Sequence, residues 1–303
     1  MRHLKKLICL SIVLSMFCSL NVFALEIDDM EEIGIPSNIS MIEHNLITGE
    51  IEEKVYQENV NLTDTAMFLD PCMPSSIIGD DDREPIDYAS GMPAAAIGKL
   101  LISGPNGKTY GGTGFLVADD LVLTAGHCLD SDIMGGHATS IVFKAGLNPD
   151  GTYIAAANAH ESYLPAEWEN NRNSDWDWAL LRLDKSLGST IGYINCRVET
   201  SPTGKSCEIQ GYAGDWSTGG NTGVTQVVGY GSVLAHTTYK MYYNADTYKG
   251  MSGAPVFIAY AYGEYGALIG VSGIHTSGTN DTETRNSGTR ITPSILTVIS
   301  NKQ

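Results

Sequence analysis

The chain has 303 residues, of which 43% are hydrophobic and 17% are charged, and its formal net charge is −17. This length allows a sizeable core, and the low charge with 33 glycines and 15 tyrosines favours an all-β globular protein over a disordered or coiled-coil one. The acidic balance argues against nucleic acid as a partner, because phosphate binding requires clustered Lys and Arg.

The first 24 residues have the layout of a secretory signal peptide. A basic start, MRHLKK, precedes the 14-residue apolar run Leu7–Leu20, and the small residue Ala24 follows. The run is shorter than the roughly 20 residues that a membrane-spanning helix needs. We therefore expect cleavage after Ala24, a secreted, extracellular protein and no membrane segment after signal removal. An N-terminal membrane anchor is the alternative.

Residues 25–75 form an acidic segment that holds twelve Asp and Glu residues against one Lys. A charged, glycine-poor stretch between an export signal and a glycine-rich region predicts a pro-segment, with a simple acidic linker as the alternative. The predicted organisation is a signal peptide at 1–24, a pro-segment at 25–75 and one domain at 76–303.

After residue 75, short apolar runs alternate with Gly, Asn, Asp and Pro. Many short strands with turn signals between them predict a sandwich or a barrel. The run PSILTVISNK predicts a closing helix over 293–302. Among the strand candidates are GTGFLVA (112–118), LVLTA (121–125), WALLRL (178–183) and GALIGVSGI (266–274).

Three of the six cysteines, Cys128, Cys196 and Cys207, lie in the predicted domain. Because export permits disulfides, and because Cys196 and Cys207 flank a turn-rich segment, these two are predicted to form a disulfide bond. Cys128 is then either a buried thiol or the partner of Cys72 in the precursor, and the sequence leaves both open.

Ser252 stands in a setting that suits a nucleophile. A serine hydroxyl needs a base within hydrogen-bond reach and a carboxylate that orients the base. Gly250 lets the backbone turn so that its own N–H and that of Ser252 can point at a developing oxyanion. An ordinary turn serine is the alternative. The G-x-S-x-G elbow of α/β-hydrolases is excluded, because Ala254 stands where the second glycine is required.

Four motifs follow one another in the order GTGFLV (112–117), LTAGHC (123–128), DWALLRL (177–183) and GMSGAPVF (250–257). Together they resemble the successive motifs of trypsin-like serine proteases, and the likeness spans about residues 76–300. The resemblance implies an all-β fold of two six-stranded antiparallel β-barrels of chymotrypsin type with a short C-terminal helix.

The same resemblance implies the catalytic roles. His127 matches the general base, Ser252 the nucleophile and Asp177 the acid that orients the imidazole, acting through an acyl-enzyme with no metal and no cofactor. Asp175 is a second candidate for the acid, because in an extended chain it would share a face with Asp177. The family motif favours Asp177, which directly precedes the apolar strand.

Within this group the chain resembles bacterial glutamyl endopeptidases at SIIGDDDR (76–83), GYAGD (211–215), DTYKGMSGAPVF (246–257) and GVSGIHTSG (270–278). Three departures from that pattern are Ala213 in place of a proline, and Lys249 and Met251 in place of small or polar residues.

The likeness implies that His275 meets an acidic substrate side chain at P1, the residue before the scissile bond. In that family the α-amino group of the mature chain, here at Ser76, adds positive charge. A buried carboxylate needs donors or positive charge, and Thr247 supplies a hydroxyl for the same purpose. The alternative for His275 is a core histidine bonded to backbone.

Two rival functions remain. Asp246 lies six residues before Ser252, where trypsin-like enzymes that cut after Lys or Arg keep the acid of their substrate pocket. An inactive, protease-like binding module is the second rival. The run 80–82 is expected to be a solvated acidic turn, with a cation site as the alternative. Neither Ser75 nor Ser76 is acidic, so we expect another protease to activate the precursor. The partners expected are protein or peptide substrates, and the protein is expected to be a monomer.

Overall fold

The computed structural model describes residues 38–57, 76–263, 266–278 and 285–303, with the backbone alone at 259–263 and 266–269. The expected signal peptide at 1–24, much of the expected pro-segment and Cys72 lie outside the described residues. None of the described helices is long and apolar enough to cross a membrane.

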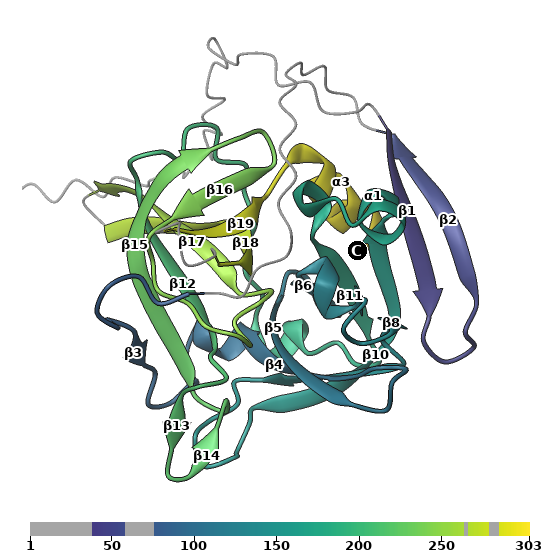
Figure 1. Ribbon diagram of the computed structural model, residues 1–303, viewed down its shortest axis with the longest axis horizontal. Coiled ribbons are helices and arrows are strands. Elements are labelled where there is room, and N and C mark those ends of the chain that lie inside the picture. Colours follow the sequence, from purple (N-terminus) through teal and green to yellow (C-terminus); the bar gives the residue numbers. More distant parts are fainter. Residues whose placement is uncertain (1–37, 58–75, 264–265, 279–284) are drawn as a thin grey trace, which may run out of the picture. The chain divides into compact units, whose positions relative to one another are not determined.

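Two antiparallel sheets each close into a six-stranded barrel (Figure 1). The first runs β11-β6-β5-β4-β9-β10 and is closed by the pairing of β10 with β11, while the second runs β12-β17-β18-β19-β16-β15 and is closed by β12 with β15. The chymotrypsin-type double barrel expected from the motifs is confirmed. The barrel strands are β4 (Ile97–Ser103), β5 (Thr109–Leu116), β6 (Leu121–Thr124), β9 (Ser140–Ala145), β10 (Ala155–Pro165), β11 (Ala179–Leu183), β12 (Ser206–Tyr212), β15 (Gln226–His236), β16 (Lys240–Tyr243), β17 (Pro255–Gly263), β18 (Gly266–Ser277) and β19 (Asn286–Arg290).

Short elements connect and flank the barrels. The short strands are β3 (Glu84–Pro85), β7 (Asp130–Ser131), β8 (Gly136–His137), β13 (Ser217–Thr218) and β14 (Asn221–Thr222). The helices are α1 (Ala166–Asn171), α2 (Gly188–Ile191) and α3 (Pro293–Lys302), with 3-10 turns η1 (Ala94–Ala96), η2 (Gly126–Cys128) and η3 (Ser174–Trp176).

The closing helix α3 occupies the residues expected from the sequence. The Thr292 hydroxyl accepts the Ile295 N–H at its start, and Pro293 takes a first-turn position where no N–H is needed. Ile295, Val298 and Ile299 are buried, which is the spacing of one helix face. The helix is therefore capped locally and held by its apolar side.

Part of the acidic 25–75 segment is folded onto the first barrel. Strands β1 (Asn38–Asn45) and β2 (Ile51–Gln57) form a hairpin, and β1 pairs with β10, extending that sheet to eight strands (Figure 1). Ile39 and Met41 are buried in the same core as the barrel. The hairpin thus belongs to the barrel's packing, which its acidic composition did not reveal.

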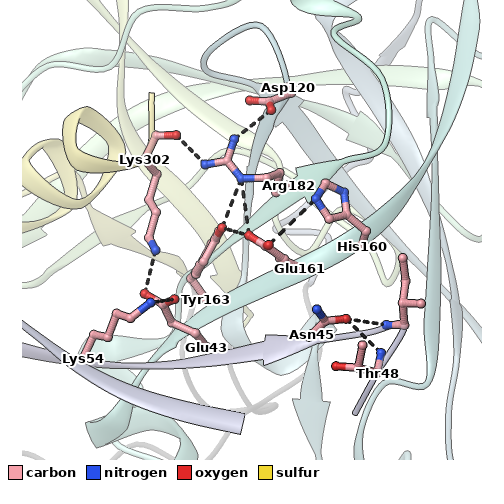
Figure 2. A network of polar contacts seen from close by, with 11 residues as sticks. Glu43, Asn45, Thr48, Lys54, Asp120, His160, Glu161, Tyr163, Arg182 and Lys302 are labelled. Atoms are coloured by element: carbon pink, nitrogen blue, oxygen red, sulfur yellow. Dashed lines mark hydrogen bonds and ion pairs between the residues drawn. The ribbon is translucent and has the colours of Figure 1, made fainter. Parts of the chain in front are cut away.

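A polar network ties the hairpin to the C-terminal helix (Figure 2). Glu43 accepts from Lys302 Nζ at 2.6 Å and from Lys54 Nζ at 2.8 Å. Burial alone would raise the pKa of Glu43, but the two lysines hold it below its ordinary value. Arg182 in β11 donates to the Lys302 carbonyl and pairs with Asp120 at 2.7 Å, so three distant segments meet here.

We expect Met41→Ala to loosen the hairpin by about 2–5 kcal/mol, because a fully buried side chain is removed from a packed core. Hydrogen exchange of the β1 amides in the full chain measures this as a loss of protection. Val55→Ala is the matched control in β2, since Val55 is 60% exposed and should change protection little. Equal effects of the two variants would contradict the packing described here.

The expected disulfide between Cys196 and Cys207 is wrong, because both are free thiols in the structure. Cys207 lies in β12, which pairs with β17. The backbone of Cys196 instead forms an isolated β-bridge with Val271 of β18. The strands β17 and β18 therefore lie between the two cysteines. Because neighbouring strands are about 4.8 Å apart, the Cα atoms of Cys196 and Cys207 are farther apart than the roughly 7 Å that a disulfide bond can span. Burial raises the pKa of each thiol to about 12. Cys128 is also a buried free thiol.

Candidate active site

Two paired strands of the first barrel bring His127 and Asp177 together. The turn η2, which carries His127, follows β6, and Asp177 ends η3 just ahead of β11. Ala179 of β11 lies opposite Thr124 of β6, so the residues flanking this pair become neighbours. His127 and Asp177, which are fifty positions apart in the chain, are therefore brought together by the pairing of β6 with β11.

The imidazole of His127 is oriented at two points by one carboxylate. Nδ1 lies 2.8 Å from Asp177 Oδ2, and the His127 backbone N–H donates to Oδ1 at 2.9 Å. Asp177 is 1% exposed. Burial alone would lower the pKa of His127, but the charge of Asp177 outweighs it and holds that pKa well above its ordinary value. Burial likewise opposes ionisation of Asp177, yet His127 keeps its pKa below the usual range.

Gly126 lets the chain pass close to this pair. A Cβ at Gly126 would lie 3.0 Å from Trp168 Cδ1 and 3.2 Å from Asp177 Oδ1. The Trp168 ring itself is 6.4 Å from the His127 ring, centre to centre. The glycine in LTAGHC therefore makes room for the indole and the carboxylate that flank the histidine.

Ser252 lies beside the turn that carries His127. Its carbonyl accepts the Thr113 N–H of β5 at 2.8 Å and faces the Cys128 thiol at 3.7 Å. Gly250 and Gly253 flank it with φ of +97° and +87°, and a Cβ at Gly253 would lie 2.1 Å from the Thr113 carbonyl. These two positions require glycine.

The N–H groups of Gly250 and Ser252 are the expected oxyanion donors. Within the described part of the chain, neither donates to an acceptor of the protein. Two backbone donors without partners beside a serine can receive an oxygen that gains negative charge during a reaction.

Asp175, the second candidate for the orienting acid, takes another place. Its backbone N–H donates to Asn173 Oδ1 at 3.1 Å, as part of the η3 turn. Burial raises the pKa of Asp175, against the opposing charge of Lys240. The carboxylate in contact with His127 is that of Asp177.

Two of the expected substrate-binding residues, His275 and Thr247, are fully buried. His275 is 0% exposed, and the Tyr243 hydroxyl lies 2.7 Å from its Nδ1. Burial, with the charges of His127 and Lys240, lowers the pKa of His275 to about 3, so this ring is neutral at pH 7. The Thr247 hydroxyl is buried and has no hydrogen-bond partner in the described structure.

Ser76 is fastened next to Thr247. Its N–H donates to Asn286 Oδ1 at 3.0 Å, and its carbonyl accepts from Asn286 Nδ2 at 2.7 Å and from the Thr247 N–H at 3.3 Å. Asn286 also donates to the Ala245 carbonyl, so its amide ties Ser76 to the segment that precedes Ser252.

Asp246 holds the segment 76–83 in place. Its carboxylate accepts the N–H of Ile78 at 2.6 Å and that of Asp82 at 3.2 Å, and the residue is 2% exposed. Arg83 adds a second anchor through Asp215 at 2.7 Å, and it also pairs with Asp81 of the same segment at 2.8 Å. The acidic run 80–82 is exposed, as expected of a solvated turn, while the Asp81 carboxylate and the Asp82 N–H also make the contacts given above.

Lys240 is a residue of this region that the sequence analysis missed. It is 3% exposed, and its Nζ donates to Thr276 Oγ1 at 2.9 Å and to the Ser174 carbonyl at 3.2 Å. Its charge lowers the pKa of Asp177 and helps keep His275 neutral. A lone lysine in the run KMYY carries no local sign of these partners, which lie 36 and 66 residues away.

Comparisons with known proteins found relatives of this chain among proteases. A family model described as trypsin matches residues 92–299. The chain is 32% identical over 256 residues to the extracellular metalloprotease of Bacillus subtilis, covering 82% of this chain and 75% of that protein. It is 30% identical over 237 residues to the glutamyl endopeptidase of Bacillus licheniformis, covering 76% and 70%.

Solved structures are similar as well. A Glu endopeptidase in complex with MPD superposes with a TM-score of 0.65 at 28% identity, over 75% of this chain and 98% of that one. The protease Anisep from Arthrobacter nicotinovorans has a TM-score of 0.54 at 21% identity, over 69% and 93%, which is a likeness of fold.

Proposed function

We propose that this chain, which belongs to the trypsin family and is a serine endopeptidase, cleaves peptide bonds after glutamate, or aspartate, residues. The observation that carries the proposed specificity is the Thr247 hydroxyl, a buried donor without a partner in the described structure. The N–H of the same residue donates to the Ser76 carbonyl at 3.3 Å. An unpaired buried hydroxyl costs free energy, and a substrate carboxylate would remove that cost.

In the proposed mechanism His127 takes the proton of Ser252 at Nε2, the ring nitrogen that Asp177 leaves free. Ser252 Oγ attacks the substrate carbonyl, and the N–H groups of Gly250 and Ser252 receive the oxyanion. His127 then protonates the leaving amine, and water hydrolyses the acyl-enzyme in the same way. The contact of Asp177 with Nδ1 fixes the tautomer and stabilises the imidazolium.

The P1 carboxylate would be bound by donors rather than by a fixed cation alone. Thr247 offers a hydroxyl and His275 a neutral imidazole, whose pKa would rise beside a bound carboxylate. Cleavage before Ser76 would add an α-amino group next to Asn286 and Thr247. Because the Asn286 amide already holds Ser76, removal of the pro-segment would change the charge of the pocket more than its shape.

Cleavage after Lys or Arg is less well supported. Both carboxylate oxygens of Asp246 already accept backbone N–H groups of the 76–83 segment. An acid that is 2% exposed and occupied in this way is poorly placed to receive a long basic side chain.

The name of the Bacillus subtilis relative raises the question of a catalytic metal. In the described part of the chain, one group of three side chains lies close enough to share an ion: His44, His137 and Glu169. It includes a residue of the expected pro-segment and none of the residues at Ser252. Two imidazoles and a carboxylate are donors that zinc accepts, but none of them belongs to the site at Ser252. The proposed reaction therefore uses the protein's own side chains.

The specificity is tested with matched peptides that carry Glu, Asp, Gln, Lys or Leu at P1, on protein processed at Ser76. We expect a strong preference for Glu, and we expect Thr247→Val to lower kcat/KM for the Glu peptide at least tenfold, because a hydrogen bond to a charged group is lost. Cleavage of the Leu peptide should be unchanged, which makes it the internal control.

A preference for Lys that disappears in Asp246→Asn would overturn the proposed specificity and keep the family. A Glu preference that survives Thr247→Val but not His275→Gln would assign the pocket to the histidine instead of the threonine.

A further inference from the structure

Three lysines line a cavity next to Gly250. The cavity has a volume of about 470 Å³, and Lys99 of β4, Lys144 of β9 and Lys249 reach its wall. None of its lining residues is acidic. Only eight lysines follow residue 75 in a chain of net charge −17, so three of them at one cavity is a marked local concentration of positive charge. We call it the lysine cavity.

Lys99 is buried there without a counter-ion. It is 8% exposed, and within the described residues no carboxylate pairs with it, its nearest ring contact being Tyr212 at 5.9 Å. Burial lowers the pKa of Lys99 to about 8. A buried ammonium without an anion is costly, so the site gains free energy when an anion arrives.

The ammonium of Lys99 lies in space left by glycines near the active site. A Cβ added at Gly111 would be 2.9 Å from its Nζ, and one at Gly250 would be 3.5 Å away. Gly250 is the expected oxyanion glycine, so the cavity begins next to the reacting bond. Lys249 precedes Gly250 directly and is exposed, whereas Lys144 is half-buried.

The lysine cavity lies across Ser252 from the P1 residues. On one side the His275 carbonyl of β18 accepts the Gly253 N–H at 2.8 Å. On the other side Thr113 of β5 donates its N–H to the Ser252 carbonyl and its hydroxyl to the Gly250 carbonyl, each at 2.8 Å. Gly111, two residues before Thr113, lines the cavity. A peptide whose P1 side chain points to His275 therefore sends its following residues toward the lysines.

We propose that the lysine cavity is a subsite for an acidic side chain among the first three residues after the scissile bond. The proposal rests on the proposed function, because it uses the direction in which the substrate crosses the site. The enzyme would then select glutamate or aspartate on both sides of the bond it cuts. The lysines would also offset locally the repulsion between an acidic substrate and an acidic protein.

The test measures how the enzyme selects residues on the leaving-group side of the scissile bond, separately from the P1 residue. An acyl-enzyme is formed from an ester of whichever P1 residue is cleaved fastest, and dipeptide amides compete with water for it. Each amide's α-amino group attacks the acyl ester, forms an amide bond and releases the Ser252 hydroxyl. The ratio of aminolysis to hydrolysis is compared for Ala-Glu-NH₂, Glu-Ala-NH₂, their Gln counterparts and Ala-Lys-NH₂.

We expect the best Glu amide to exceed its Gln counterpart about tenfold at low salt, with Lys lowest, and the preference to shrink as salt rises. Lys249→Ala and Lys99→Met should each reduce the preference for the Glu amide over its Gln counterpart to about twofold. Lys108→Ala, an exposed lysine outside the cavity, should leave it unchanged. Lys249 is on the surface, so its variant tests the proposal even where Lys99→Met fails to fold.

Equal partition of the Glu and Gln amides in the wild-type protein would overturn the proposal, as would a Glu preference that both cavity variants, Lys249→Ala and Lys99→Met, retain. Because the acyl group is chosen by measured rate, a P1 preference other than Glu would refute the proposed specificity while the partition experiment still tested the cavity.

Discussion

Asp177→Asn is expected to lower kcat of the processed protein about 10⁴-fold with little change in its fold. The carboxylate accepts both the Nδ1 proton and the backbone N–H of His127, so it fixes the tautomer in which Nε2 can receive a proton. An amide can turn its NH₂ toward Nδ1 and hold the opposite tautomer. The measurement is kcat at saturating peptide, with a thermal unfolding curve for each variant.

Asp175→Asn is the matched control, because Asp175 lies two residues away, is partly buried and donates its backbone N–H within the η3 turn. The kcat of Asp175→Asn should stay within about threefold of wild type, because a substitution that removes no catalytic contact has a small effect. A large loss in Asp175→Asn and a small one in Asp177→Asn would reverse the assignment of the orienting acid.

The Asp177→Asn variant is also expected to change the pH dependence of activity. The general base must be neutral, so kcat/KM rises as pH passes upward through the pKa of His127. The Asp177 charge raises that pKa well above its ordinary value in this structure. Removing the charge lowers it, and the rising limb of the residual activity should therefore move to lower pH. A limb that stays in place would mean that another group controls it.

Sequence patterns located the parts of this site that local geometry determines. The resemblance of LTAGHC and DWALLRL to family motifs identified His127 and Asp177, and both motifs lie at strand ends. His127 comes three residues after a four-residue strand, and Asp177 stands two residues before a five-residue one. Glycines at 250 and 253, on either side of the Ser252 turn, are typical of positions with positive φ, and both have positive φ in the structure. These features depend on contacts within a few residues, and a single sequence contains them.

Features that depend on distant contacts were missed or misjudged. Lys240 and Lys99 are buried by strands far apart in the chain, and a lone lysine carries no mark of burial. The error over Cys196 and Cys207 arose because nearness in sequence says little once two strands lie between them. Asp246 resembled a substrate-pocket acid, yet its position serves to hold the 76–83 segment.

Ser252→Ala is expected to reduce kcat by about 10⁶-fold, the larger effect of the two, because the nucleophile itself is removed. The contacts of Ser252 with Thr113 and Cys128 use its backbone carbonyl, so alanine preserves them. The free energy of unfolding should therefore change by less than about 0.5 kcal/mol. A fluorophosphonate probe should label wild type and leave the variant unlabelled. Equal labelling of both would assign the nucleophile to another residue.

The same variant isolates the activation step, because it cannot cut itself. Neither residue at the expected processing site is acidic, so a glutamate-specific enzyme should leave the bond between Ser75 and Ser76 intact. We expect the Ser252→Ala precursor to keep its N-terminus when incubated with processed wild-type protein, and to begin at Ser76 after a protease of different specificity is added. N-terminal sequencing reads both results. Trimming to Ser76 by wild type alone would show that the enzyme accepts serine at P1, and the pocket of Thr247 and His275 would then need another substrate.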